Sequence, residues 1–229
     1  RMEPSKNILR GLEAFRVWDS ARTEAQIRDH MHLALDGDES GLLLHYTFDQ
    51  SNGSILPDRT SNGHDGTLTS MNDDDWVASA VPWADVVASR TQIRGAWAGR
   101  TASLSSGRLA LTNAVTPGAA FAVFGHDNAS ETQNTADRPD AVDWRLNRVW
   151  QIEESGNVTA DVAFDLAGWT GDFVLLVDAD GTFGDASVWT GSRQNDRFTA
   201  PGLELDDGAF YTLGHVVLPH QAFADQEGA

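Results

Sequence analysis

The chain has 229 residues, 41% of them hydrophobic, and a formal net charge of -18 at pH 7. A chain of this length can bury one large core or two modest ones, and we expect two domains. Such an acidic surface repels nucleic acid, because a protein that binds nucleic acid needs a basic stripe to displace the counterions. No apolar run approaches the roughly 20 residues of a membrane-spanning helix, and the absence of cysteine excludes disulfides, thiol catalysis and cysteine-ligated zinc.

The first predicted elements are a strand and a short helix. Residues 13–18 alternate aromatic and polar side chains, which is typical of a strand. Thr23 and Gln26 follow with the spacing of a capping box. Apolar residues then recur at helical spacing as far as Gly37, so one amphipathic helix is predicted from Glu24 to Leu35. Its apolar face consists of Ile27, Met31, Ala34 and Leu35.

Strands and turns are predicted for the rest of the chain. From Val158 to Leu166 apolar side chains alternate with polar ones, as in a strand with one buried face. Residues 121–124 and 173–177 are apolar on both faces, as expected of central strands. The sequence therefore predicts a mostly β fold of antiparallel β-sandwich units with one short helix.

Four segments are predicted along the chain. Residues 1–84 form a first domain, 85–95 a linker, 96–216 a second sandwich, and 217–229 a linker or tail. Both ends look like internal cuts, so we expect further domains in a longer parent chain.

The order of motifs in the first domain suggests a known family. The strand and helix from Glu13 to Ile27 are followed by the apolar strand from Gly41 to Asp49, then by Asp58, residues 62–68 and Trp76. This succession, over about residues 8–83, resembles the C-terminal part of a laminin G-like, concanavalin A-like jelly roll. The resemblance implies a partial jelly roll in the first domain.

The second domain carries a second resemblance. Residues 143–151, 156–158 and 175–178, with Phe183, are similar to a poorly characterised β-sandwich module of large bacterial adhesin-like proteins, over about residues 91–215. We expect an immunoglobulin-like sandwich there. The two resemblances together imply an extracellular or cell-surface location, a glycan or other cell-surface ligand, and no catalysis.

Three functions stay open from the sequence. The first is a carbohydrate-binding or adhesive module, the second a structural spacer, and the third an accessory segment of a secreted polysaccharide-degrading enzyme. We predict no enzyme activity in this chain. Glu153 and Glu154, as neighbours on a strand, face opposite sides and cannot act as the carboxylate pair of a glycosidase.

Calcium is the one candidate cofactor. Asp178 and Asp180, with Asp185 five residues further on, offer hard oxygen ligands from a tight loop after a central strand. The loop glycine, Gly181, does not occupy the EF-hand position. The alternative, which we favour, is a hairpin turn whose carboxylates accept hydrogen bonds from local amides.

Two tryptophans are candidate sugar-binding residues. Trp169 and Trp189 each precede a Thr-Gly pair in a turn-like context, where an indole can face solvent and stack on a sugar. The favoured alternative is that each plugs an end of the sandwich, because buried aromatic residues dominate core energetics.

Arg148, Trp144 and Trp150 are predicted to be structural. If this segment is one continuous strand, the side chain of Arg148 lies on the same face as those of both tryptophans, and that face is apolar. Its guanidinium cannot lose its charge, so we expect an Asp partner and nearby backbone carbonyls. The alternative is a bulge that turns Arg148 out to solvent.

Overall fold

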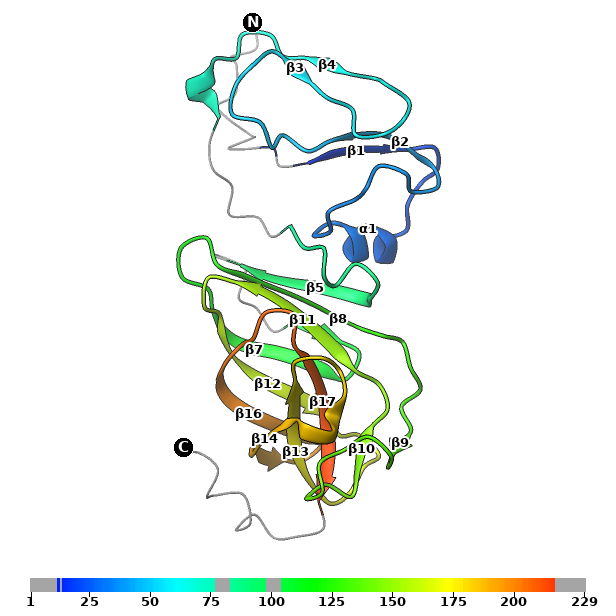
Figure 1. The fold of residues 1–229 in the computed structure, drawn as a ribbon, viewed down its shortest axis with the longest axis vertical. Helices are drawn as coiled ribbons and strands as arrows, with labels where there is room; N and C mark the ends of the chain where they lie inside the picture. The colour runs from blue at the N-terminus through cyan, green and yellow to red at the C-terminus, as the bar shows by residue number, and fades with distance from the viewer. Residues whose placement is uncertain (1–11, 13, 77–82, 98–103, 217–229) are drawn as a thin grey trace, which may run out of the picture. The chain divides into compact units, whose positions relative to one another are not determined.

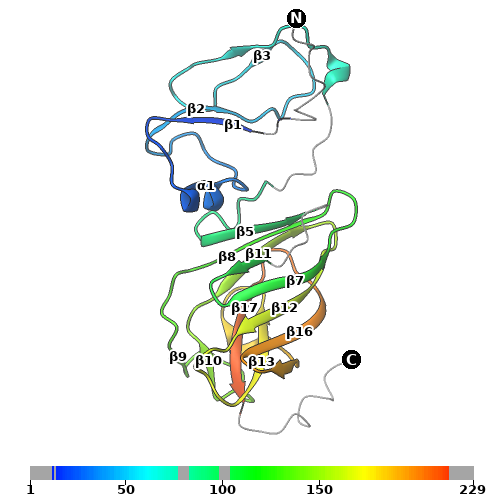
Figure 2. The same cartoon turned by 180° about the vertical axis from the view of Figure 1, so that it is seen from behind.

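The fold is described from a computed structural model for residues 12, 14–76, 83–97 and 104–216. Contacts divide the chain into two compact units, one formed by Arg1–Glu24 and Ala34–Val81, the other by Ala25–Leu33 and Pro82–Ala229. Every pair of named strands is antiparallel. Figures 1 and 2 show most of these strands together with the single short α-helix of the described residues. The predicted fold class is thereby confirmed. None of the described helices combines the length and apolar character needed to cross a bilayer.

The described residues of the first unit form two small sheets. Strand β1 (Phe15–Trp18) pairs with β2 (Leu42–Tyr46), and β3 (Ile55–Leu56) pairs with β4 (Gly66–Thr67). A 3-10 turn, η1 (Asp73–Asp75), follows.

Asp58 organises the loop between β3 and β4. Its carboxylate accepts hydrogen bonds from the backbone N–H groups of His45 at 3.1 Å, Thr60 at 3.0 Å and His64 at 3.0 Å, and from the Thr60 hydroxyl at 2.8 Å. Desolvation alone would raise the pKa of Asp58, but these hydrogen bonds outweigh it and lower the pKa to about 2. The ionised carboxylate is therefore part of the folded loop.

The second unit is a sandwich of two sheets. The smaller sheet has the order β15 (Ser192–Gln194), β16 (Arg197–Glu204), β12 (Thr159–Asp165), β7 (Leu109–Val115) and β6 (Leu104–Ser106). The larger sheet has the order β14 (Ser187–Trp189), β13 (Asp172–Asp178), β17 (Phe210–Val216), β11 (Trp150–Ser155), β8 (Phe121–His126) and β5 (Thr91–Trp97). Strand β10 (Trp144–Leu146) pairs with β17 and with the short β9 (Gln133–Asn134), and η2 (Phe183–Asp185) is a 3-10 turn.

The main core lies between these two sheets. Trp150 of β11 is fully buried and contacts Phe164 of β12 edge to face, with ring centroids 5.3 Å apart. Its indole N–H donates to the carbonyl of Ser106 at 2.6 Å, which satisfies the buried polar atom. Both sheets supply large apolar side chains to this core, among them Leu109, Leu111, Val162, Phe164, Phe198, Phe124, Trp150, Ile152, Leu175 and Tyr211.

The helix α1 (Glu24–His30) ends earlier than the predicted Leu35. The following residues join extended structure instead, since Leu33 forms a parallel bridge with Ala84 and the Ala84 N–H donates to the His32 carbonyl at 2.8 Å. The predicted apolar face is not buried, because Ile27 is 56% and Met31 47% exposed. A helix end set by so distant a residue cannot be read from local periodicity.

Residues 85–95 are not the linker that the sequence suggested. They form a turn and the first part of β5, both within the second unit. Glu153 accepts hydrogen bonds from the backbone N–H groups of Asp85 at 3.0 Å and Val86 at 2.7 Å, and Gln151 accepts two from the Arg90 side chain at 3.0 and 2.8 Å. Burial raises the pKa of Glu153. The predicted tail, 217–229, lies outside the described residues.

Consecutive strands close both sides of the sandwich. β14 ends the larger sheet and β15, next in the chain, ends the smaller one, while β5 and β6 do the same on the other side. Gly191 makes the corner between β14 and β15, where a Cβ atom would lie 2.4 Å from the Thr199 carbonyl oxygen. Glycine alone fits so close an approach of two backbones.

The Asp58 loop should lose stability in acid. Because the folded pKa of Asp58 is about 2, below the ordinary 3.8, its contribution is complete above pH 3.8 and disappears as the pH falls through 2. We expect Asp58→Asn to lower hydrogen-exchange protection of the His45, Thr60 and His64 amides at pH 6. At pH 2 variant and parent should differ little; an equal difference at both pH values would contradict this role.

Candidate functional site

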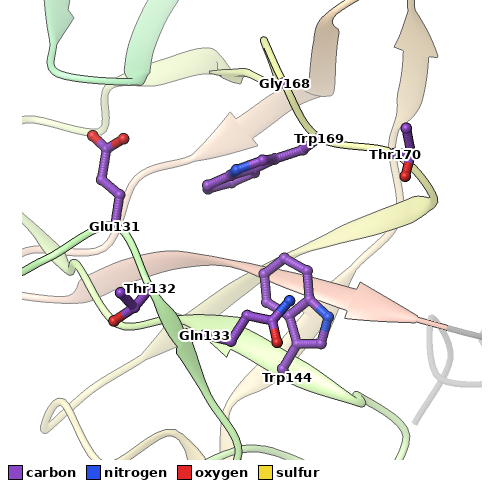
Figure 3. Close-up of a pocket in the computed structure, with 7 residues that line it drawn as sticks. All are labelled: Glu131, Thr132, Gln133, Trp144, Gly168, Trp169 and Thr170. Atoms are coloured by element: carbon purple, nitrogen blue, oxygen red, sulfur yellow. The ribbon is translucent and has the colours of Figure 1, made fainter.

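A cavity of about 510 Å³ in the second unit combines aromatic and polar side chains. We call it the Trp144–Trp169 pocket (Figure 3). Its lining consists of Glu131, Thr132, Gln133, Trp144, Gly168, Trp169 and Thr170.

Three segments that are distant in sequence meet at this pocket. Glu131 and Thr132 precede β9, and Gln133 begins that strand. Trp144 begins β10, which pairs with β9 on one side and with β17 on the other. Trp169 lies in the connection from β12 to β13. Pairing within the larger sheet brings these segments together, because β13 and β10 both pair with β17 at His215.

The two tryptophan rings are half-buried and nearly perpendicular, with centroids 6.0 Å apart and an interplanar angle of 90°. Figure 3 shows Trp169 edge-on to the viewer and Trp144 face-on below it. Trp144 also stacks on His215 with centroids 5.0 Å apart and planes 6° apart. Each indole is thus supported by packing and still reaches the cavity.

Polar contacts hold the Trp169 connection in place. Arg193 donates to the carbonyl groups of Trp169 and Gly171, each at 2.8 Å. The Arg108 guanidinium lies 4.4 Å from the centroid of the Trp169 ring, a cation–π contact. Gly171 has φ +109°, and a Cβ atom there would lie 2.3 Å from Nε2 of His215. A larger residue would displace the His215 ring on which Trp144 stacks.

Glu131 is held by two arginines. Nη1 of Arg148 donates to Oε1 of Glu131 and Nε of Arg108 donates to Oε2, both at 2.7 Å. The side chains of Arg148 and Arg108 are 16% and 21% exposed, and that of Glu131 is 30% exposed. Such partly buried, charge-assisted hydrogen bonds are stronger than neutral ones.

The structure brings together two residues for which different roles are predicted from the sequence. Trp169, predicted as a sugar ligand or a plug, and Trp144, predicted as structural, line one pocket and also pack against the main core. Sequence reasoning missed Glu131, Gln133 and Arg108. They lie in or next to turns without periodicity, so no local signal marked them.

Arg148 differs in detail from its prediction. The expected continuous strand breaks between β10 and β11, and Arg148 lies in that break. It is partly buried and has an acidic partner, but the partner is Glu131 rather than an Asp, with the Ala129 carbonyl accepting from Nε at 2.8 Å.

A more deeply buried arginine lies on the other face of the predicted strand from Arg148. Arg145 is 5% exposed, donates to the carboxylate of Asp137 at 2.6 Å, and lies over Phe183 in the smaller apolar cluster of the unit. Strand alternation does not identify the more buried arginine, because β10 has apolar packing on both faces.

Asp178 forms the hairpin turn that was favoured over a calcium loop. Its Oδ1 accepts hydrogen bonds from the backbone N–H groups of Asp180, Gly181 and Thr182 at 2.9, 2.6 and 3.0 Å. The Thr182 N–H also bonds to Asp180 and lowers the pKa of that carboxyl. Within the described residues Asp178, Asp180 and Asp185 do not come together as a metal-holding group. Calcium binding here stays a prediction.

Trp189 lies at a different cavity, of about 210 Å³, and is 41% exposed. Asp178 lines the same cavity, so one predicted sugar ligand and one predicted metal ligand are neighbours. The remaining lining residues are Val177, Ala179, Ser187, Asp206, Asp207 and Ala209.

The fold and the pocket define a β-sandwich module with an aromatic-lined cavity. Residues 90–209 match the family described as Domain of unknown function (DUF8202), which covers more than half of the chain. The chain therefore belongs to that family, and the match includes every residue of the Trp144–Trp169 pocket. Neither a search of curated proteins nor a search of solved structures found a match to the chain.

The Asp178 turn can be tested by substitution. Asp178→Ala removes the acceptor of three backbone N–H groups, of which only that of Thr182 has a second acceptor, in Asp180. We expect a loss of about 1–3 kcal/mol in the free energy of unfolding. Asp180→Ala, at an exposed position, is the matched control and should cost less. Urea unfolding with and without millimolar calcium also tests the metal, because a bound ion would stabilise the parent and not Asp178→Ala.

The Glu131 contacts predict an asymmetry. Glu131→Ala strands two guanidinium groups and should cost about 1.5–3 kcal/mol of unfolding free energy. Arg148→Met keeps apolar packing and leaves Arg108 on the carboxylate, so its cost should be smaller. Denaturant unfolding of both variants measures the difference, and a larger loss for Arg148→Met would refute the argument.

Proposed function

We propose that the second unit is a non-catalytic, extracellular or cell-surface module that binds a glycan in the Trp144–Trp169 pocket. The observation that carries the proposal is the convergence of two half-buried indoles and four polar side chains on one open cavity. Sugars present apolar C–H faces and a ring of hydroxyl groups. An aromatic surface with a few convergent polar groups complements both.

The preorganisation of the pocket supports binding. Trp144 stacks on His215, the Trp169 connection is bonded to Arg193, and Glu131 is fixed by two arginines. Side chains that are already ordered lose little conformational entropy when a ligand binds. A small number of contacts with the ligand can therefore be enough for measurable affinity.

The carboxylate of the pocket favours binding over hydrolysis. Glu131 is the one acidic residue among the lining residues. Glycosidases ordinarily place two carboxyl groups on either side of the bond they cleave. The geometry therefore suits recognition of an intact sugar.

A glycan array with the fluorescently labelled chain tests the proposal. We expect binding to a subset of immobilised oligosaccharides, and titration calorimetry with the best soluble oligosaccharide should confirm it. Trp169→Ala should weaken that binding about 30-fold, equivalent to about 2 kcal/mol.

Trp189→Ala is the matched control, since it removes an exposed indole from the other cavity of the same unit. Its affinity should equal that of the parent. Circular dichroism melts of both variants check that they fold. Loss of binding in Trp189→Ala alone would move the site to the smaller cavity, and no binding by the parent would refute the proposal.

A further inference from the structure

The smaller cavity of the second unit, of about 210 Å³, combines an exposed indole with carboxylate groups, and we call it the Asp178–Trp189 cavity. Trp189 of β14 pairs with Leu175 of β13, which belongs to the main core. Directly paired residues have their side chains on the same face of a sheet, so the indole lies on the inner face of an edge strand. It is nevertheless 41% exposed, and no cation of the described residues lies over its ring. The indole is therefore available to a ligand.

Three carboxylates from two parts of the chain line the same cavity. Asp178 ends β13, and Asp206 and Asp207 lie in the connection from β16 to β17. The pairing of Asp178 with Phe210 of β17 brings the two parts together. Among the described residues that line the cavity, none is a lysine, an arginine or a histidine. A ligand here meets concentrated negative charge, in a chain whose net charge is -18.

Asp178 is only 7% exposed, and one of its two carboxylate oxygens has no hydrogen-bond donor. Oδ1 accepts from all three N–H groups of the hairpin turn, whereas Oδ2 has no donor among the described residues and is not sealed off from solvent. The nearby carboxyl group of Asp180 supplies no proton, because its lowered pKa keeps it ionised. A buried charge is costly unless it is paired. A cation in the cavity would supply that pairing.

The arrangement suits an organic cation better than a metal ion. Calcium takes about six to eight oxygen ligands at about 2.3–2.6 Å, and the acidic side chains of the described residues nowhere gather as a group that could hold a metal. An ammonium group needs fewer acceptors, and its alkyl stem can lie along an indole, where the charge also interacts with the ring. The volume of about 210 Å³ is below the roughly 300–1,000 Å³ of pockets for drug-sized ligands, and so suits a single side chain.

We propose that the Asp178–Trp189 cavity binds an alkylammonium group, the chemistry of a lysine side chain. Oδ2 of Asp178 and the carboxylates of Asp206 and Asp207 receive the ammonium, while Trp189 covers the stem. The cavity shares no lining residue with the Trp144–Trp169 pocket, so this proposal does not depend on glycan binding.

Nuclear magnetic resonance of the full chain tests the charge of the ligand. The probes are n-butylammonium and Nα-acetyllysine methylamide, and their neutral counterparts are n-butanol and Nα-acetylnorleucine methylamide. Titration should shift the signals of the Trp189 indole N–H and the Gly181 backbone N–H. We expect the neutral counterparts to bind at least about tenfold more weakly, and high salt to reduce this difference. The tighter of the two cationic probes identifies the source, a free amine or a lysine side chain, and either result supports the site.

Two double variants with the same net charge locate the site. Asp206→Asn combined with Asp207→Asn keeps the side-chain volumes and an acceptor for the Glu154 N–H, and should weaken ammonium binding about tenfold. Asp140→Asn combined with Asp172→Asn, at exposed positions outside the lining of the cavity, is the control. It should change the affinity by less than about twofold, because distant exposed charges are screened.

Trp189→Leu keeps an apolar wall but removes the aromatic ring, so it should weaken ammonium binding about threefold at the Gly181 signal. Equal binding of a cationic probe and its neutral counterpart would overturn the proposal, as would unchanged ammonium affinity in the folded Asp206→Asn and Asp207→Asn double variant. Signals that calcium shifts at lower concentration than either ammonium probe would assign the cavity to a metal ion instead. The dispersion of the amide spectrum checks that each variant is folded.

Discussion

The apolar contact between the two sheets of the second unit is the interaction on which its other features depend. Side chains such as Phe164 from the smaller sheet and Trp150 from the larger one are fully buried against each other. Burial of apolar area contributes about 25 cal/mol per Å² and is the main term that can offset the entropy of ordering the chain. The two packed sheets form a scaffold that positions the connecting loops and the functional side chains on them.

The pocket adds a polar cross-link to this apolar frame. Arg108 lies in the turn that enters β7 of the smaller sheet, whereas Arg148 and Glu131 belong to connections of the larger sheet. One carboxylate therefore joins loops from both layers. Stability and recognition are coupled at Glu131, because the group that faces the cavity also holds its walls. A substitution there has to be assessed by folding and by binding separately.

The sequence was most informative where structure is set by near neighbours. The alternation from Val158 to Leu166 predicted a half-buried strand, and Asp178 predicted a hairpin turn, because both patterns depend on residues a few positions away. Long-range partners decided the rest. The helix ends at His30, shortly before Leu33 pairs with Ala84, and the segment expected to be a linker is bonded to side chains of β11.

The candidate site likewise contains residues that the sequence indicates and residues that only the structure reveals. Trp169 was a candidate from its turn-like context, but its meeting with Trp144 follows from strand pairing around His215. Glu131 could not have been found, because its importance comes from arginines 17 and 23 residues away in sequence. Strand alternation predicts the orientation of Arg148 only on an unbroken strand, and it gives no sign that Arg145 is buried.

The corner at Gly191 has a consequence for copies of this unit crowded together. An open edge strand offers a row of unpaired amide and carbonyl groups that can recruit a strand from another molecule and lead to aggregation. Here β14 and β15, three residues each, form the two edges on that side, and the tight turn carries the chain from one layer to the other. Edge strands this short offer few backbone groups for pairing with a strand of another molecule. On this side the sandwich can therefore lie close to its neighbours while its sheets stay separate from theirs.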